Sequence, residues 1–152
     1  LEMDMVISSA LDYAYRASLI LARKYDDGGP VTTAQIAAAE GLSEGFLLQV
    51  LAILRRAGIV HSIRGKNGGY RLAKAPSQVT LADICGAMET SRPRSDCPMR
   101  PDAKCCRNDP TCHLVHALSE ASRAAEVRLA AFDLETLSQT ADVEAQAVLY
   151  AS

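Results

Sequence analysis

The sequence predicts a mainly α-helical fold with one small β-hairpin. Apolar residues make up 49% of the 152 residues and aromatic residues only 5%, so the core must consist largely of Ala, Leu, Ile and Val. Ala and Leu favour helices, and in much of the chain the apolar residues recur every three or four positions, as on one face of a helix. One glycine-rich stretch between two short β-type segments indicates the hairpin.

The spacing of apolar residues and the positions of capping residues predict the first two helices. Apolar positions follow helical spacing from Val6 to Tyr25, which predicts the first helix. Thr32 or Thr33 can cap a short second helix that extends to Glu40. Gly41 then ends this helix and permits a tight turn, because glycine adopts backbone conformations that other residues avoid.

The third helix is expected to begin after Ser43, a good N-cap residue, and to end at Gly58. A short helix, a turn that contains glycine and a longer helix together form the helix-turn-helix pattern. Within this third helix, Leu48 is expected to add an apolar contact to the core.

A β-hairpin follows the third helix. Ile59 to Ile63 predicts a strand, Gly-Lys-Asn-Gly-Gly at 65–69 predicts a turn, and Tyr70 to Ala73 predicts the returning strand. A helix-turn-helix followed by a basic hairpin is a winged helix. We therefore expect residues 3–90 to form a winged helix-turn-helix domain.

The next part of the chain changes in character. Thr80 and Asp83 are expected to cap a fourth helix that ends near Glu89. Residues 91–112 then hold four of the six prolines and four of the five cysteines, with Met99 as the one large apolar side chain. Such a segment buries too little apolar surface to offset its loss of conformational entropy, so we expect a functional loop that a bound cluster or metal ties together.

A long helix is expected over residues 113–139, again with apolar residues every three or four positions. One small domain has no evident use for so long a helix, since the average helix has about 11–12 residues. We therefore expect it to pack against its copy in a second subunit, as a dimerisation helix. The tail over residues 140–152 gives no structural signal.

Basic residues gather in the third helix and the hairpin. The net charge of the chain is -2, yet residues 43–75 contain six Lys and Arg and one acid. A basic surface on an acidic protein is typical of a face that binds nucleic-acid phosphates. In a helix-turn-helix the second helix enters the major groove, and an Arg at a wing tip commonly enters the minor groove. The candidate DNA contacts are Thr33, Ser43, Glu44, Gln49, Arg55, Arg56, Arg64, Lys66 and Tyr70.

Several other classes receive no support from the sequence. It contains no run of about 18 uncharged apolar residues and no basic leader before an apolar run, so we expect a cytoplasmic protein that does not span a membrane. In a reducing compartment five cysteines indicate metal or redox chemistry, although Cys85 lies on an apolar helical face and is expected to be a core thiol. No nucleophile–base or acid pair is apparent outside the cysteine-rich segment, so we do not expect an enzyme.

One motif carries a resemblance to a known family. The run Ile63 to Ala73, Ile-Arg-Gly-Lys-Asn-Gly-Gly-Tyr-Arg-Leu-Ala, is followed by Pro76 and by Val-Thr-Leu-Ala-Asp-Ile at 79–84. Together with Asp-Tyr-Ala at 12–14 and Leu-Arg-Arg-Ala-Gly at 54–58, this pattern resembles the Rrf-type winged-helix transcription regulators. That family includes iron–sulfur and redox sensors, and the resemblance covers nearly the whole chain.

The resemblance implies a homodimer that binds a palindromic operator in double-stranded DNA. It also implies that a 2Fe-2S or 4Fe-4S cluster, held by three loop cysteines and a fourth ligand, controls this binding. Cys106 fits the middle position better than Cys105, because five residues separate Cys106 from Cys112, as is usual in the family. The implied ligands are Cys97, Cys106, Cys112 and Asp12 of the partner subunit, with Cys105, His116 and His113 as alternatives.

Two other kinds of chemistry remain open for the cysteine-rich segment. Three thiolates with His113 or His116 could form a tetrahedral zinc site, although a cluster is favoured over zinc. Neighbouring cysteines such as Cys105 and Cys106 could instead form a thiol–disulfide switch. The alternative function is therefore a thiol-disulfide or zinc-containing winged-helix regulator that a protein partner controls.

Overall fold

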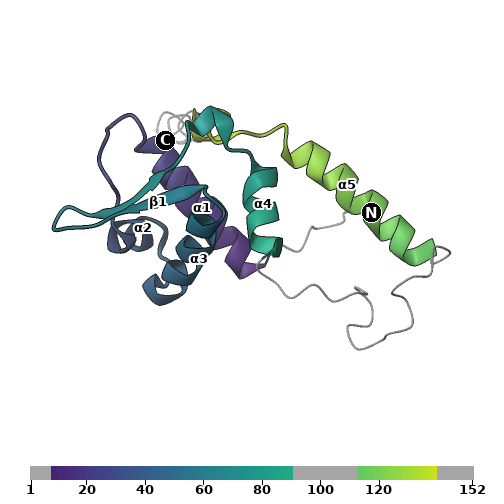
Figure 1. The fold of residues 1–152 in the computed structure, drawn as a ribbon, viewed down its shortest axis with the longest axis horizontal. Helices are drawn as coiled ribbons and strands as arrows, with labels where there is room; N and C mark the ends of the chain where they lie inside the picture. The colour runs from purple at the N-terminus through teal and green to yellow at the C-terminus, as the bar shows by residue number, and fades with distance from the viewer. Residues whose placement is uncertain (1–7, 91–112, 140–152) are drawn as a thin grey trace, which may run out of the picture.

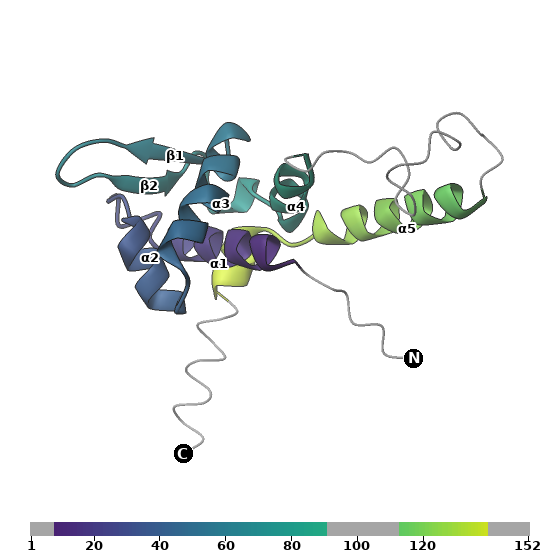
Figure 2. The same ribbon diagram turned by 90° about the horizontal axis from the view of Figure 1, so that it is seen from below.

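The computed structural model describes residues 8–90 and 113–139, and it confirms the mainly α-helical fold with a β-hairpin. Residues 8–90, which we call the body, form one end of the molecule, and helix α5 extends away from them, as both Figure 1 and Figure 2 show. The elements are α1 (Ser9–Arg23), α2 (Thr33–Glu40), α3 (Glu44–Arg56), β1 (Val60–Ile63), β2 (Gly69–Leu72), the 3-10 turn η1 (Pro76–Gln78), α4 (Leu81–Thr90) and α5 (His113–Leu129).

The predicted side-chain cap forms at the start of α2, whereas Ser43, the residue before α3, makes no side-chain capping hydrogen bond. The Oγ1 of Thr32 accepts a hydrogen bond from the backbone N–H of Gln35 at 3.2 Å, and the Oε1 of Gln35 accepts one from the N–H of Thr32 at 2.9 Å. This reciprocal capping box satisfies two backbone donors at the start of α2, so Thr32 rather than Thr33 is the cap. Gly41 ends α2 with a left-handed φ of 63°, as its sequence position predicted.

The two strands pair antiparallel, with Val60 opposite Leu72 and Ile63 opposite Gly69. Val31, just before α2, adds a bridge on the other side of β2 through two backbone hydrogen bonds with Tyr70, of 2.9 and 2.8 Å. A Cβ at Gly69 would lie 2.5 Å from the Val31 carbonyl oxygen, so this close approach requires glycine. This pairing therefore attaches β2 to the segment that leads into the helix-turn-helix.

One apolar core holds the body together. It is formed by the inner faces of α1, α2, α3 and α4, by Val60 and Leu72 of the hairpin and by Leu134. Removal of this aliphatic surface from water is the main source of stability for so small a unit. The fully or almost fully buried large side chains are Leu21, Ile36, Leu47, Val50, Leu51, Leu54, Val60, Ile84 and Leu134.

The fourth helix begins as the sequence predicted. The Oδ2 of Asp83 accepts a hydrogen bond from the backbone N–H of Thr80 at 2.8 Å, and the Oγ1 of Thr80 accepts one from the N–H of Asp83 at 3.2 Å. This second capping box fixes the start of α4 where the chain leaves the hairpin. The segment 91–112 after α4 and the tail 140–152 lie outside the described residues.

The expectation of one unbroken helix over residues 113–139 is wrong in its extent. Helix α5 ends at Leu129, and helical structure resumes only at residues 134–139. Between them the chain forms a bridge with the segment before α4: the N–H of Leu81 donates to the Phe132 carbonyl at 2.9 Å, and the N–H of Leu134 donates to the Val79 carbonyl at 2.9 Å. Burial of Leu134 in the core of the body accompanies this break.

No single helix in the described ranges is long and apolar enough to cross a membrane. Helices α2 and α3 reach the required length and apolarity only together, and a bend of 117° separates them.

Candidate nucleic-acid interface

Helices α2 and α3 form the predicted helix-turn-helix, and α3 presents one face to solvent. Its inner face is buried through Leu47, Val50, Leu51 and Leu54. In a helix-turn-helix the outer face of the second helix is the one that enters the major groove. The candidate contacts Ser43, Glu44, Gln49, Arg55 and Arg56 are all exposed, so each is accessible to a duplex.

An aromatic pair sets the position of the start of α3. The backbone N–H of Ser43 donates to the Oη of Tyr13 on α1 at 3.1 Å. The ring of Tyr13 also packs edge-to-face on Phe46, with ring centroids 4.9 Å apart. Tyr13 therefore orients the end of α3 that would meet base edges. No local pattern predicts this role of Tyr13, because the two residues lie 30 positions apart in the sequence.

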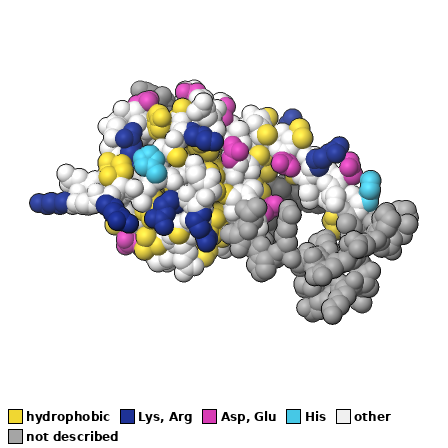
Figure 3. Space-filling model, viewed as in Figure 1, with side chains coloured by type: hydrophobic (Ala, Val, Ile, Leu, Met, Phe, Trp, Pro, Cys, Tyr) yellow, Lys and Arg dark blue, Asp and Glu magenta, His cyan; other side chains and the backbone are white. Residues whose placement is uncertain are grey.

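The cations of α3 and the hairpin have no carboxylate partner within the described residues. The ion pairs in the described part of the chain involve other cations: Arg16 pairs with Asp12 and Glu40, and Lys24 pairs with Asp27. Arg64 and Lys66 are exposed at the turn of the hairpin, and Figure 3 shows Lys and Arg side chains gathered over the hairpin and the neighbouring part of the body. Their charges are thus available to phosphates rather than neutralised within the chain.

Two of the candidate contacts, Arg55 and Tyr70, also hold the interface together. The Nη1 of Arg55 lies 3.4 Å from the Oγ of Ser62, a contact that connects the end of α3 with β1. Tyr70 is half-buried and packs against the core, while its backbone pairs with Val31. Thr33 is half-buried in the first turn of α2. For Tyr70 in particular, the structure gives a packing reason for the residue type.

The candidate cluster ligands are only partly within the described residues. Cys97, Cys105, Cys106 and Cys112 lie outside them, as does the side chain of His113. His116 is exposed on α5. In the ranges 8–90 and 113–139, no three His, Cys, Asp or Glu side chains gather closely enough to bind a metal ion.

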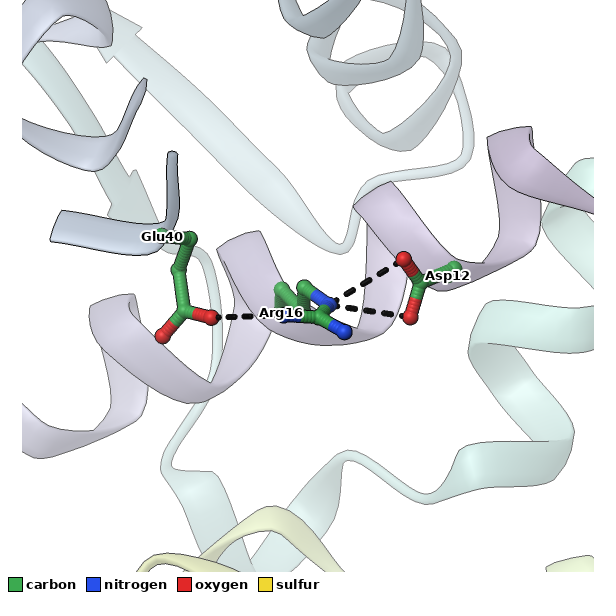
Figure 4. Close-up of polar contacts among 3 residues, drawn as sticks. All are labelled: Asp12, Arg16 and Glu40. Carbon is green, nitrogen blue, oxygen red and sulfur yellow. Dashed lines mark hydrogen bonds and ion pairs between the residues drawn. The ribbon is translucent and has the colours of Figure 1, made fainter. Parts of the chain in front are cut away.

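Asp12, the candidate fourth ligand, belongs to a small ionic network on α1. Figure 4 shows the guanidinium of Arg16 between two carboxylates. Its Nε lies 2.9 Å from Oδ1 of Asp12, and its Nη1 lies 3.2 Å from Oε2 of Glu40 on α2. Hydrogen bonding and charge attraction from Asp12 raise the pKa of Arg16. Arg16 was not among the predicted site residues, although its i,i+4 spacing from Asp12 is the usual signal of such a pair.

Cys85 is the one cysteine within the described residues. The sequence predicted a buried core thiol, but Cys85 is only half-buried. Its Sγ lies 3.7 Å from Oε1 of Glu89, and burial and the charge of Glu89 raise its pKa. The neighbouring Tyr15 donates from its Oη to the Leu81 carbonyl at 3.3 Å, and burial raises its pKa to about 12. A thiol with a raised pKa stays protonated at neutral pH and is a poor nucleophile.

Comparison with known sequences places this geometry in a family. The sequence profile of the Rrf2 family, described as iron-dependent transcriptional regulators, matches residues 7–140. The HTH-type transcriptional regulator slr0846 of Synechocystis is 40% identical over 87 residues, and protein aau3 of Rhizobium meliloti is 40% identical over 90 residues. These alignments cover 57% and 59% of this chain, and in each case 58% of the relative's own length.

Solved structures extend the similarity to almost the whole chain. IscR of T. potens superposes with a TM-score of 0.71 and 29% identity, over 91% of this chain and 90% of that protein. CymR, the global cysteine regulator of B. subtilis, gives a TM-score of 0.65 and 31% identity, over 90% of this chain and 98% of that protein. The chain therefore belongs to the Rrf2 family of winged-helix transcription regulators, which bind DNA and are not enzymes.

Proposed function

We propose that this regulator is a cytoplasmic homodimer whose binding to a palindromic operator is controlled by an iron–sulfur cluster. The observation that carries the proposal is that one chain contains both a cationic DNA-binding surface and a cysteine-rich segment. An exposed cationic reading surface on α3 and the hairpin is followed, directly after α4, by a segment with four cysteines. The similarity to IscR supports a cluster as the group that those cysteines hold.

The DNA-binding surface uses two elements. The start of α3, with Ser43 exposed just before it and Gln49 exposed within it, presents hydrogen-bonding groups to base edges in the major groove. The hairpin turn carries Arg64 and Lys66 without carboxylate partners in the described residues, so these cations reach the phosphates or the adjacent minor groove.

The cluster ligands in this proposal are Cys97, Cys106, Cys112 and Asp12 of the partner subunit. The donor set fits, because iron–sulfur clusters take thiolates and tolerate one oxygen or nitrogen ligand. Asp12 fits as well, since its side chain is 44% exposed on α1, where its carboxylate faces Arg16, as Figure 4 shows. When bound, the cluster supplies a centre whose charge and ligation change with iron, oxidant or nitric oxide. Arg16 holds the Asp12 side chain and also contacts Glu40 in the helix-turn-helix.

The dimer in this proposal is formed by α5. Apolar side chains recur along this helix at Leu118, Ala121, Ala125 and Leu129, a spacing that puts them on one face. Leu118 is 38% exposed, and only the C-terminal end of α5 packs on the body. A second copy of the same face would cover this stripe.

The alternative is a thiol-disulfide or zinc regulator controlled by a protein partner. The observation that favours it is the similarity to CymR, a cysteine regulator. Its sequence identity to this chain, 31%, is comparable with the 29% of IscR. In that case Cys105 and Cys106 would exchange between thiol and disulfide. In the zinc form of this alternative, loop cysteines together with His113 or His116 would bind a structural zinc ion.

Anaerobic purification separates the two proposals. A cluster gives a brown protein with visible charge-transfer absorption and with iron and sulfide in equal amounts; zinc gives a colourless protein. The matched pair Cys105→Ser and Cys106→Ser identifies the middle ligand. Loss of colour is expected only for Cys106→Ser, and equal retention in both variants would contradict the proposed ligand set.

The DNA half is tested with Arg64→Ala against Arg23→Ala, an exposed Arg on α1 away from the hairpin. Arg64→Ala should weaken operator binding and reduce the slope of log affinity against log salt by about 1, whereas Arg23→Ala should change neither. Equal behaviour of the two variants would remove Arg64 from the interface.

A further inference from the structure

We propose that Leu48 recognises a thymine in the operator through the C5-methyl group of that base, in space left free by Gly45 one helical turn earlier. The inference rests on the proposed function, in which α3 enters the major groove. It adds a specificity-determining side chain to that surface.

Leu48 is not part of the core, so the expectation of a core contact is wrong. Its side chain remains 46% exposed, whereas its neighbour Leu47 is fully buried on the inner face of α3. Single exposed leucines are common on protein surfaces, so exposure alone does not identify a contact. The position of Leu48 indicates a contact, because this residue lies among those that the helix-turn-helix geometry directs toward the major groove.

Gly45 gives the second, independent observation. A glycine inside a helix is less favourable than alanine, so it needs a reason. Packing within the chain gives none, because a Cβ built at Gly45 meets no atom within 4 Å. Backbone conformation gives none either, since Gly45 is not among the glycines with positive φ. A bare stretch of helix surface is needed where an outside molecule approaches the backbone closely.

The two features lie on one face. Residues three apart in a helix are neighbours on its surface, so the space left at Gly45 lies next to the Leu48 side chain. Gln49, also exposed, adjoins them and offers an amide for hydrogen bonding. The outer face of α3 therefore combines a gap, an aliphatic group and an amide, and packing within the chain accounts for none of the three.

The chemistry of this face selects one base. In the major groove, thymine presents a C5-methyl group, whereas the other bases present only hydrogen-bond donors and acceptors there. A leucine side chain cannot donate or accept hydrogen bonds, so it gains free energy only by removing apolar surface from water. Contact with a thymine methyl group meets this condition.

The test uses the full chain, purified anaerobically, and an operator selected with it from a pool of random DNA duplexes. Each thymine of the selected sequence is replaced in turn by deoxyuridine, which lacks only the methyl group. At one thymine in each half-site the replacement should weaken binding about fourfold, as expected for one methyl group buried. In Leu48→Ala this loss should disappear at that thymine. Because Leu48 is exposed, the variant should fold, which its Tm verifies.

Two control variants sharpen the result. Gln49→Ala should bind more weakly overall yet keep the deoxyuridine effect, and Leu48→Met should keep it because the aliphatic contact survives. If Leu48→Ala retains the full loss at every thymine, or weakens all duplexes equally, the inference is overturned while the DNA-binding function stands. If the chain selects no sequence at all, the proposed function fails as well.

Discussion

The body and α5 use their apolar side chains in opposite ways. In the body, large aliphatic residues such as Leu51 and Ile84 are fully buried within the same chain. On α5, Leu118 is 38% exposed and Val127 is 67% exposed. Helices of about 12–15 residues are marginal in water without packing, so a helix of 17 residues that is attached at one end needs further contacts. The core of the body is therefore closed within the chain, with Leu134 as its contribution from beyond α5, whereas α5 itself leaves large apolar side chains exposed.

The largest expected effect concerns the residue that connects the two regions. Leu134 follows α5 in sequence but is fully buried in the core of the body. We expect Leu134→Ala to lower the free energy of unfolding by about 3 kcal/mol, because it leaves a cavity in a close-packed core. Urea denaturation at a fixed protein concentration measures this change.

Val127→Ala is the matched control for this experiment. Its side chain is 67% exposed, so its removal should change the free energy of unfolding by less than about 0.5 kcal/mol. Similar losses in both variants would mean that α5 is as firmly packed as the body, and the contrast between the two regions would not hold.

The next prediction concerns the face of α5 that carries Leu118, which the proposed dimer would bury. Leu118→Asp should weaken the dimer by about 2 kcal/mol, roughly 30-fold, because it puts a charge into an apolar interface. Val127 lies nine positions further along, on the opposite side of the same helix, so Val127→Asp should leave the dimer intact. Sedimentation across a range of concentrations measures both. The reverse pattern would place the interface on the other face.

Much of the body could be predicted because its signals are local. The capping boxes of Thr32 with Gln35 and of Thr80 with Asp83 span three residues each, and both form. The Gly-rich turn between β1 and β2 fixed the hairpin in the same way. Wherever a short segment determines its own hydrogen bonds, sequence spacing is sufficient to locate the element.

The errors occurred where distant parts of the chain decide the outcome. Helical spacing continues through Leu129 and Phe132, so no local signal marks the break, which depends on backbone pairing with Val79 and Leu81. The exposure of Leu48 likewise depends on which face of α3 the rest of the body covers. The four cysteines of the candidate cluster site were identified by composition and resemblance, and they lie outside the described residues.

A smaller effect is expected at the cap of the segment 134–139. Oδ1 of Asp133 accepts a hydrogen bond from the backbone N–H of Thr136 at 2.8 Å, and this bond lowers the pKa of the Asp133 carboxyl. Asp133→Ala should therefore cost about 1 kcal/mol at neutral pH, as is typical when an N-cap is lost. Denaturation curves of the two proteins at pH 7 provide the comparison.

The same carboxylate predicts a pH dependence. Because its pKa is lower in the folded state, the charged form adds stability above about pH 4, the ordinary pKa of Asp, and this contribution is lost as the pH falls through the lowered value. Asp133→Asn keeps a capping oxygen but cannot titrate. The stability difference between wild type and Asp133→Asn should therefore shrink on acidification, and a constant difference would contradict the assignment.

The smallest effect is expected at the exposed network of Arg16. This side chain joins α1 to α2, but it is 46% exposed, and surface ion pairs contribute little because water and salt screen them. Arg16→Ala should leave the Tm of the body almost unchanged, with Arg16→Lys as the charge-preserving control. A clear loss of Tm would mean that the network, and not the core alone, holds α2 against α1.

The backbone pairing between Val79–Leu81 and Phe132–Leu134 has a mechanical consequence. It fastens the beginning of α4 to the chain just beyond the end of α5, so the two helices diverge from a common base (Figure 1). Residues 91–112 join their far ends, Thr90 and His113. Any change in the span between those two residues must alter the angle between the helices unless one of them unwinds. Because Ile84 anchors α4 in the core, such a change would move α5 relative to the body.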